Sequence, residues 1–240
     1  MTEFRIPPLV VDYGQLWLAA DIHGDDADWP QRSAAELLAR PHWAAYRTKK
    51  GEKQLVEILR QATGVARKRG ESASMGFILY PSPEEAPKGI VVFSPVDIVG
   101  RGTEEAWADL LAQLAPEIPG GYPPDITVMA TKAGECRRLR LRYAAGEGPE
   151  RPVGEHIWYL WVFADYGAGM IMSISFNSIL ESARWLPALD ELATDVWLQR
   201  HPGQEEPGRG PGRPGRSGHG EEAGALTGGR AHRAAGDGGR

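Results

Sequence analysis

The chain has 240 residues, a formal net charge of -5, and hydrophobic and charged fractions of 42% and 25%. These fractions are ordinary for a globular protein, so they exclude a chain that is disordered throughout. The single cysteine, Cys136, excludes an intramolecular disulfide and a metal site built from several cysteines. The mild acidity gives no general reason to expect a nucleic acid or an anionic membrane as partner.

The first residues show no targeting signal. Residues 1–8 lack the basic start and apolar stretch of a signal peptide, and the next apolar run, 9–20, is interrupted by polar residues. Nowhere does the sequence approach the run of about 18 apolar residues that a membrane-spanning helix needs. We therefore expect a cytoplasmic protein with no membrane partner.

Two helices are expected before the first strands of a sheet. Ser33 and Glu36 form a capping-box pattern, which predicts a helix over 34–40 that Pro41 ends. A longer amphipathic helix is expected over 52–69, and together the two form a helical insertion over residues 33–70. The inward positions of the longer helix are Leu55, Ile58, Leu59, Ala62, Val65 and Ala66.

The hydrophobic pattern changes to that of strands after residue 72. Strands over 73–80 and 90–99 are separated by a proline-rich stretch and are expected to form a hairpin. A helix over 103–114 follows, with Thr103 as its cap. Its inward positions are Trp107, Leu110, Leu111 and Leu114.

Four strands and a last helix are expected from residue 125 onward. The strands cover 126–131, 137–143, 157–164 and 170–177, and the third is apolar at every position, which places it centrally with both faces covered. Ser178 and Glu181 predict the start of a helix that runs to residue 199, in which Pro187 is tolerable only in the first turn. Its inward positions are Leu186, Leu189, Ala193, Val196 and Trp197. The predicted class is α+β, an antiparallel sheet flanked by helices.

The composition changes sharply after residue 200. Residues 201–240 hold 13 glycines, 4 prolines and 6 arginines but no aromatic residue. Because burial of apolar side chains offsets the entropy of ordering a backbone, we predict one folded domain over 1–200 and a disordered tail over 201–240. The spacing Gly210-x-Gly212-x-x-Gly215 matches a dinucleotide fingerprint, but prolines surround it where the fingerprint needs a strand and a helix.

The order of the elements resembles the PsbP-like α-β-α sandwich family. The resemblance rests on residues 136–143, 156–165, 169–177 and 181–199, and it extends over residues 4–200 as a pattern of elements. The helical insertion and the lack of a lipoprotein cysteine depart from that pattern. Members of the family are mostly noncatalytic binding or assembly factors, so the resemblance implies a binding role. It assigns no functional residue, because it involves no signature motif.

Common enzyme signatures are absent from the sequence. There is no Gly-x-Ser-x-Gly elbow, no Walker loop and no His-Glu-x-x-His motif. Since catalytic groups can be assembled from distant positions, an enzyme stays open as an alternative. No cofactor or metal is expected, because His23 with Asp25, Asp26 and Asp28 lacks the spacing of a calcium loop and indicates a solvated acidic loop.

A few isolated side chains have both a chemical and a structural explanation. Two arginines follow Cys136 and would favour its thiolate, but no base is patterned nearby and an inert cysteine is expected. We expect His156 at the surface near a loop, and Ser173 and Ser175 as small packing residues. The aromatic group that includes Trp158 is expected in the core.

Positive charge is the strongest candidate for a functional surface. One group lies on the helix over 52–69 and just before it, and a second alternates with apolar residues on the strand over 137–143. If the two groups meet, they form an anion- or partner-binding surface on an acidic protein. The residues are Lys49, Lys50, Lys53, Arg60, Arg67, Lys68, Arg138, Arg140 and Arg142.

Taken together, the sequence indicates a protein that binds another protein and has no chemistry of its own. One alternative is an enzyme or small-molecule binder that uses a pocket between the sheet and a helix, which an apolar cavity with convergent polar groups would favour. Another is binding of an anion or a nucleic acid through the basic faces.

The nucleic-acid alternative leads to a direct test. We expect no complex between the full chain and duplex DNA at about 50 mM salt, because the chain is acidic overall. Gel-shift titration measures this. A complex that forms at low salt and weakens steeply as salt is added would contradict the expectation.

Overall fold

The structure of the chain is a computed structural model. It describes residues 3–23, 26–69, 73–115, 122–144 and 152–199. The chain divides into two units, Met1–Arg200 and His201–Arg240. The predicted disordered tail lies outside the described residues, and all that follows concerns the first unit.

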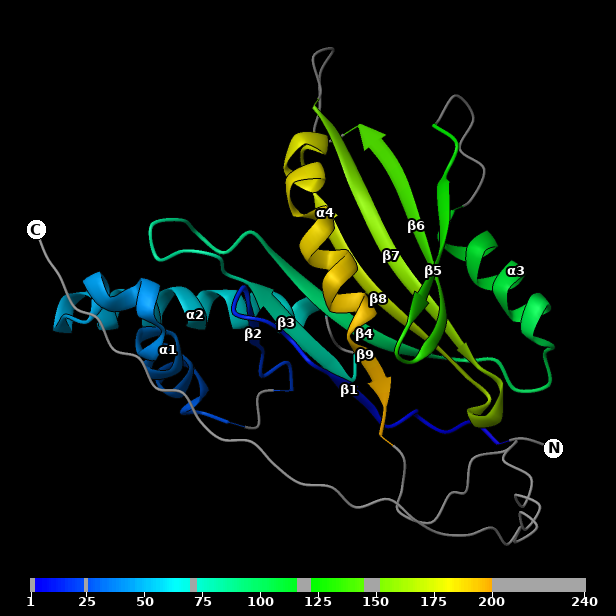
Figure 1. Cartoon of the computed structure of the whole chain (residues 1–240), viewed down its shortest axis with the longest axis horizontal. Helices are drawn as coiled ribbons and strands as arrows, with labels where there is room; N and C mark the ends of the chain where they lie inside the picture. Colours follow the sequence, from blue (N-terminus) through cyan, green and yellow to red (C-terminus); the bar gives the residue numbers. More distant parts are fainter. Residues whose placement is uncertain (1–2, 24–25, 70–72, 116–121, 145–151, 200–240) are drawn as a thin grey trace, which may run out of the picture. The chain divides into compact units, whose positions relative to one another are not determined.

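A seven-stranded antiparallel sheet is the main element of this unit (Figure 1). The strand order is β2-β3-β4-β8-β7-β6-β5, so the predicted hairpin and the predicted antiparallel pair β7–β8 are both present. This confirms the predicted fold class. The strands are β2 (Trp17–Ala19), β3 (Met75–Leu79), β4 (Gly89–Asp97), β5 (Asp125–Thr131), β6 (Gly134–Ala144), β7 (Val153–Phe163) and β8 (Ala168–Phe176).

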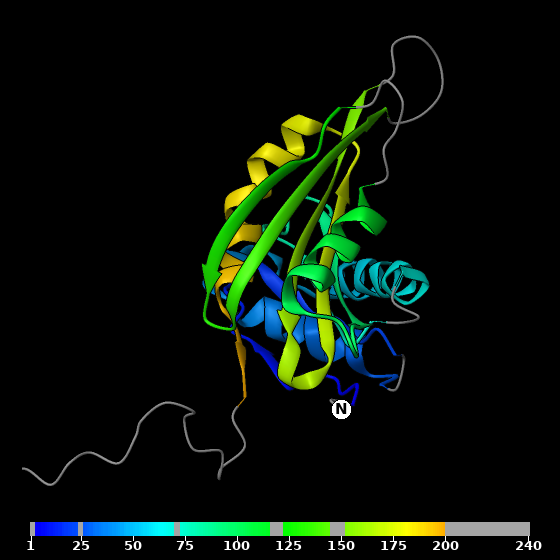
Figure 2. The same ribbon diagram turned by 90° about the vertical axis from the view of Figure 1, so that its right-hand side faces the viewer.

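Helices pack against both faces of the sheet, with α3 and α4 on opposite sides of it (Figure 2). The helix α4 (Ile179–Thr194) covers one face and buries Trp185 and Leu189 against the sheet. On the other face lie α1 (Trp29–Ala39), the short 3-10 helix η1 (Pro41–Tyr46) and α2 (Lys49–Arg69), which enclose a second apolar core. The helix α3 (Thr103–Leu114) covers another part of this face through Trp107 and Leu110.

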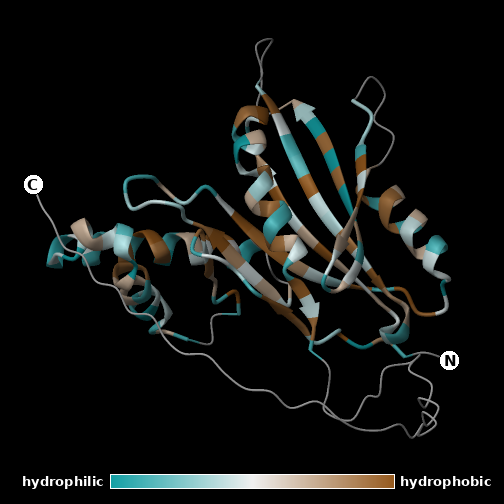
Figure 3. Cartoon of the chain, in the orientation of Figure 1, coloured by the Kyte–Doolittle hydropathy of each residue, from teal (hydrophilic) through white to brown (hydrophobic). Residues whose placement is uncertain are grey.

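The central strand β7 explains why both faces must be covered. Tyr159 and Trp161 face the core beneath α4, whereas Leu160 packs against α3 on the opposite face. All three side chains are fully buried, as expected for a strand without alternation. The strands β3 and β4 are likewise mostly hydrophobic, while hydrophobic and hydrophilic residues alternate along α1 and α2 (Figure 3).

Two helices begin earlier than predicted, α1 at Trp29 and α2 at Lys49, and α3 has a different cap. The helix α1 begins at Trp29, with Pro30 in its first turn, and Ser33 lies buried inside it instead of capping it. A proline suits the first turn of a helix, where its missing N–H has no partner to lose. In α3 the N-cap is Gly102, whose N–H donates to the Glu105 carboxylate at 3.4 Å, so Thr103 is the first helical residue. The N-cap predicted for α4 is correct, since the Ser178 hydroxyl accepts from the Leu180 N–H at 3.2 Å.

The end of the last helix was predicted wrongly. The helix α4 ends at Thr194, and Val196–Leu198 forms a strand, β9, that pairs with the N-terminal strand β1 (Leu9–Val11). As a strand residue, Val196 is buried while Trp197 points outward and is 37% exposed, so Trp197 is not an inward position of a helix.

Pro187 lies inside α4 and beyond its first turn, contrary to the prediction. Pro187 and Ala183, four residues earlier, both lie on the exposed side of the helix. The carbonyl that loses its helical donor is therefore on the side where water can replace it.

One inward position of α2 was also predicted wrongly. Val65 is 47% exposed and does not face the core.

No helix of the described residues is long and apolar enough to cross a membrane.

Gly154 on β7 provides a stability test. A Cβ at this residue would lie 2.6 Å from Cζ of Tyr143 and 2.7 Å from the Phe176 carbonyl oxygen. We expect Gly154→Ala to lower the free energy of unfolding by about 1–3 kcal/mol, because the backbone carbonyl cannot move away without disturbing β8. Chemical denaturation measures the change. The control is Gly14→Ala, since a Cβ there meets nothing within 4 Å, and an equal loss in both variants would contradict the explanation.

Candidate functional site

The strand part of the predicted basic surface is paired inside the fold. Arg138 binds Asp190 of α4 through its Nη1 at 2.6 and 2.9 Å, and Arg140 binds Glu155 of β7 at 2.9 Å. The Nε of Arg142 lies 3.7 Å from the Glu155 carboxylate. Only Arg142 of the three is exposed. The positive charge that the strand pattern shows is therefore largely neutralised by carboxylates from β7 and α4.

The helical part of that surface lies elsewhere. Arg60 pairs with Glu57 at 2.6 Å and Arg67 with Asp21 at 3.3 Å. The remaining predicted residues on α2, Lys49, Lys50, Lys53 and Lys68, are exposed. The strands β8 and β7 separate β6 from β4, against which α2 packs, and α2 and β6 lie apart in Figure 1. The structure does not bring the two groups together.

The other candidate side chains offer little for catalysis. Burial raises the pKa of the Cys136 thiol well above its ordinary value, which opposes thiolate formation despite the nearby arginines. Of the predicted acidic loop, Asp26 forms an ion pair with Arg32, while Asp25 lies outside the described residues. Within the described ranges there is no group of His, Cys, Asp or Glu side chains that could hold a metal ion.

A partly exposed aromatic row lies on the face of the sheet opposite α4. The ring of His156 stacks on Tyr143 at 4.3 Å between centroids and contacts Trp158 at 5.3 Å. Its Nδ1 lies 2.6 Å from the Ser175 hydroxyl. Trp158 is therefore not part of the core beneath α4, unlike its neighbours in the sequence. Ser175 is the second-last residue of β8 and is paired opposite His156 in the ladder, so this contact anchors the histidine ring to β8.

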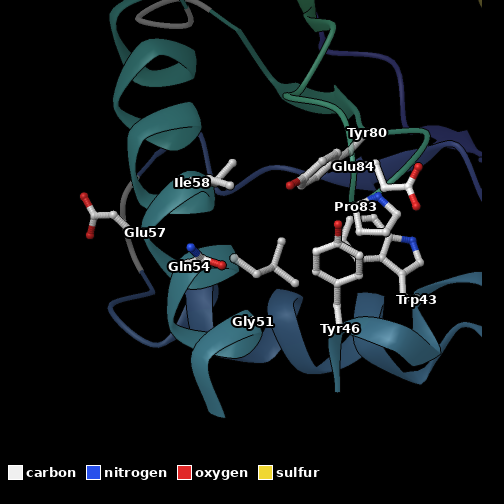
Figure 4. Close-up of a pocket in the computed structure, with 10 residues that line it drawn as sticks. Trp43, Tyr46, Gly51, Gln54, Glu57, Ile58, Tyr80, Pro83 and Glu84 are labelled. Carbon is white, nitrogen blue, oxygen red and sulfur yellow. The ribbon is translucent and has the colours of Figure 1, made fainter. Parts of the chain in front are cut away.

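A cavity of about 500 Å³ lies between η1, the first half of α2 and the chain that follows β3 (Figure 4). It is open to solvent and its walls are mostly apolar. Its lining residues are Trp43, Tyr46, Gly51, Gln54, Leu55, Glu57, Ile58, Tyr80, Pro83 and Glu84.

Three aromatic rings form one side of the cavity. Trp43 and Tyr80 are fully buried and meet edge to face, with ring centroids 4.9 Å apart. The hydroxyls of Tyr46 and Tyr80 point toward the middle of the space (Figure 4). Burial, together with the nearby Tyr46, raises the pKa of Tyr80 to about 12, so this hydroxyl is protonated at neutral pH and can donate as well as accept a hydrogen bond.

Local interactions hold η1 against α2 and so place the aromatic rings. Arg47 donates from Nε to the Leu38 carbonyl at 2.6 Å, which fixes the chain after η1 to the end of α1. The Thr48 hydroxyl then accepts from the Gly51 N–H at 3.1 Å at the start of α2. A Cβ at Gly51 would overlap the Tyr46 carbonyl oxygen. Glycine at this position is therefore what allows Tyr46 to approach the helix.

The charged side chains that line the cavity are acidic. Among the described residues that line it there is no lysine or arginine, and its charged residues are Glu57 and Glu84. Glu57 points away from the middle of the space (Figure 4) and binds Arg60. Glu84 is exposed beside Pro83. Phenol hydroxyls, the Gln54 amide and one carboxylate thus surround an aromatic space, an arrangement suited to binding rather than to nucleophilic chemistry.

Sequence reasoning did not single out these aromatic residues. Trp43 and Tyr46 lie between two expected helices, and Tyr80 ends a strand more than thirty residues later. A possible signal was the pair of aromatic residues in a short segment bounded by Pro41 and Gly51, where no core strand or long helix could absorb them.

Comparisons with known proteins found only weak similarity to this chain. No family profile and no curated protein sequence matches the chain. Two solved structures show weak similarity: the Saccharomyces cerevisiae Ran-binding protein Mog1p, 13% identical, and a point mutant of protein Mog1, 12% identical. Each match covers 54% of this chain and 80% of the other, with a TM-score of 0.37. Similarity at this level carries no inference about function.

The buried thiol can be tested directly. We expect Cys136 in the folded chain to resist a chromogenic disulfide reagent at about pH 8, because burial both blocks access and raises its pKa. In denaturant the same reagent should titrate one thiol per chain. Absorbance measurements check both, and rapid reaction of the folded chain would contradict the burial of this side chain.

Proposed function

We propose that this protein is a noncatalytic protein-binding module whose docking point is the cavity between η1, α2 and the end of β3. The observation that carries the proposal is the open, aromatic cavity of about 500 Å³, which has convergent hydrogen-bonding groups but no nucleophile and base in contact among its lining residues. Pockets of this kind accept the anchor side chains that dominate the energy of protein–protein interfaces.

A small-molecule ligand is the second candidate, because the volume also falls in the range of ordinary ligand pockets. Its support is the pair of phenol hydroxyls beside the Gln54 amide. Binding of nucleic acid has less support, since Arg138 and Arg140 are held by carboxylates of the same chain. Membership of the PsbP-like family and a cytoplasmic location remain predictions.

The proposal is tested by filling the cavity with a side chain. Gln54 is exposed and lines the space, so Gln54→Trp should block it without disturbing the core. The matched control is Gln113→Trp, the same change at an exposed residue of α3. We expect affinity capture with the full-length chain, from lysate of the cell that makes it, to recover proteins that Gln113→Trp retains and Gln54→Trp loses by at least about tenfold.

Quantitative mass spectrometry measures these ratios. Identical sets of captured proteins with both variants would contradict a docking role for the cavity. Loss of a bound metabolite from Gln54→Trp alone, detected in the purified protein, would favour the small-molecule candidate instead.

A further inference from the structure

A second hollow lies along α2 and shares the lining residue Ile58 with the cavity. This hollow, of about 390 Å³, is lined by Ile58, Gln61, Ala62 and Val65 of α2, by residues 86–90 and by Ser175 of β8. Both hollows lie between α2 and the stretch 80–90, and Ile58 lines each of them. We call the two together the α2 groove.

The spacing of the two hollows fits an extended chain. Gln54 marks the first hollow and Ala62 the second, and eight residues of helix span about 12 Å. In an extended peptide, four residues span about 13 Å, and residues i and i+4 point to the same side. A single peptide can therefore place one side chain in each hollow.

The first hollow favours a positive group. A guanidinium or ammonium is attracted to the faces of tryptophan and tyrosine rings, and the attraction strengthens as water is excluded. Tyr46 supplies a partly exposed ring and Glu84 an exposed carboxylate, with no lysine or arginine among the described lining residues to repel a cation. An anionic group would find no positive partner there.

The second hollow favours an apolar group. Ile58, Ala62 and Val65 face Pro87 and Ile90 across it, and Val65 is 47% exposed. The only lysine that lines it in the described part of the chain is Lys88, which pairs with Glu85 at 2.7 Å. An apolar side chain placed here would cover the exposed part of Val65.

From this charge and spacing we infer that the α2 groove binds an extended segment of a partner protein with a basic residue at position i and a large apolar residue at i+4. The inference rests on the proposed function and specifies its partner. Backbone contacts with the groove would be common to many segments, so the two side chains provide the specificity.

The probe is a heptapeptide with blocked ends, Gly-Arg-Gly-Ser-Gly-Leu-Gly, titrated into the full-length chain at up to millimolar concentration. Heteronuclear NMR follows the amide signals of α2 and the tryptophan indoles. We expect replacement of arginine by citrulline, which has a similar shape without the charge, to weaken binding about tenfold. Moving leucine to i+3 should weaken it to a similar degree, because the side chain then points away from the second hollow.

Variants of the protein assign the effect to the groove. Glu84→Gln should weaken binding of the arginine peptide about two- to threefold and leave the citrulline peptide unchanged, as expected for one exposed ion pair. The control is Glu191→Gln, which removes an exposed carboxylate on α4. Gln54→Trp should abolish the shifts along α2.

Several outcomes would overturn the inference. One is equal affinity for the arginine and citrulline peptides, and another is the absence of any shift at millimolar peptide. Tighter binding of a peptide with the chain's own Leu226-Thr-Gly-Gly-Arg230 sequence would assign the groove to the chain's C-terminal region. Self-association lost in Gln54→Trp would assign it to a second copy. If captured proteins depend on Gln54 while the basic peptide does not bind, the proposed function stands and this inference alone fails.

Discussion

The burial of β7 on both faces is the constraint on which the rest of the structure depends. A strand with apolar side chains on both sides cannot be stable at an edge or beneath a single layer. It therefore lies inside the sheet, with α4 on one face and α3 on the other. With α3 and α4 in those places, the half of the sheet formed by β2, β3 and β4 is left for α1, η1 and α2 to cover. There η1, α2 and the stretch 80–90 line the α2 groove.

The same constraint explains why charge is found inside the fold. Glu155 lies near the start of β7 and is only 1% exposed, so an unpaired carboxylate here would be costly. Arg140 and the Ser182 hydroxyl both bind it. Tyr159 and Arg138 likewise both donate to the Asp190 carboxylate. Burial, together with the hydrogen bond to Asp190, raises the pKa of Tyr159. These polar contacts set the position of α4 over the sheet, which apolar packing alone would leave less specific.

Much of the fold could be predicted from local patterns. Alternation and unbroken apolar runs located the six longer strands of the sheet within a few residues, and Ser178 marked the start of α4 because its side chain bonds to its own helix. The three-residue strands β1, β2 and β9 were missed, since three residues cannot show a period. The prediction for Pro187 was wrong because the free-energy cost of a proline inside a helix depends on whether the carbonyl four residues earlier faces water.

The site was harder to predict than the fold, for a related reason. The arginines of β6 suggested a basic surface because the sequence does not show that Asp190 and Glu155 lie opposite them. The cavity depends on rings from η1 and from Tyr80, directly after β3, which are distant in the sequence and meet only because Gly51 allows the close approach of η1. In both cases the missing information was a contact between segments, which periodicity within one segment does not contain.

The pairing of β1 with β9 has a consequence for how the chain folds. Leu9 and Leu198 are partners although nearly the whole first unit separates them in the sequence. Closing such a long loop is entropically expensive, so this ladder forms only after the sheet has reduced the distance between its ends. We therefore expect this pairing to form late in folding. A chain still emerging from the ribosome cannot complete it until residue 198 is released, which delays the final closure of the domain until translation of the first unit is over.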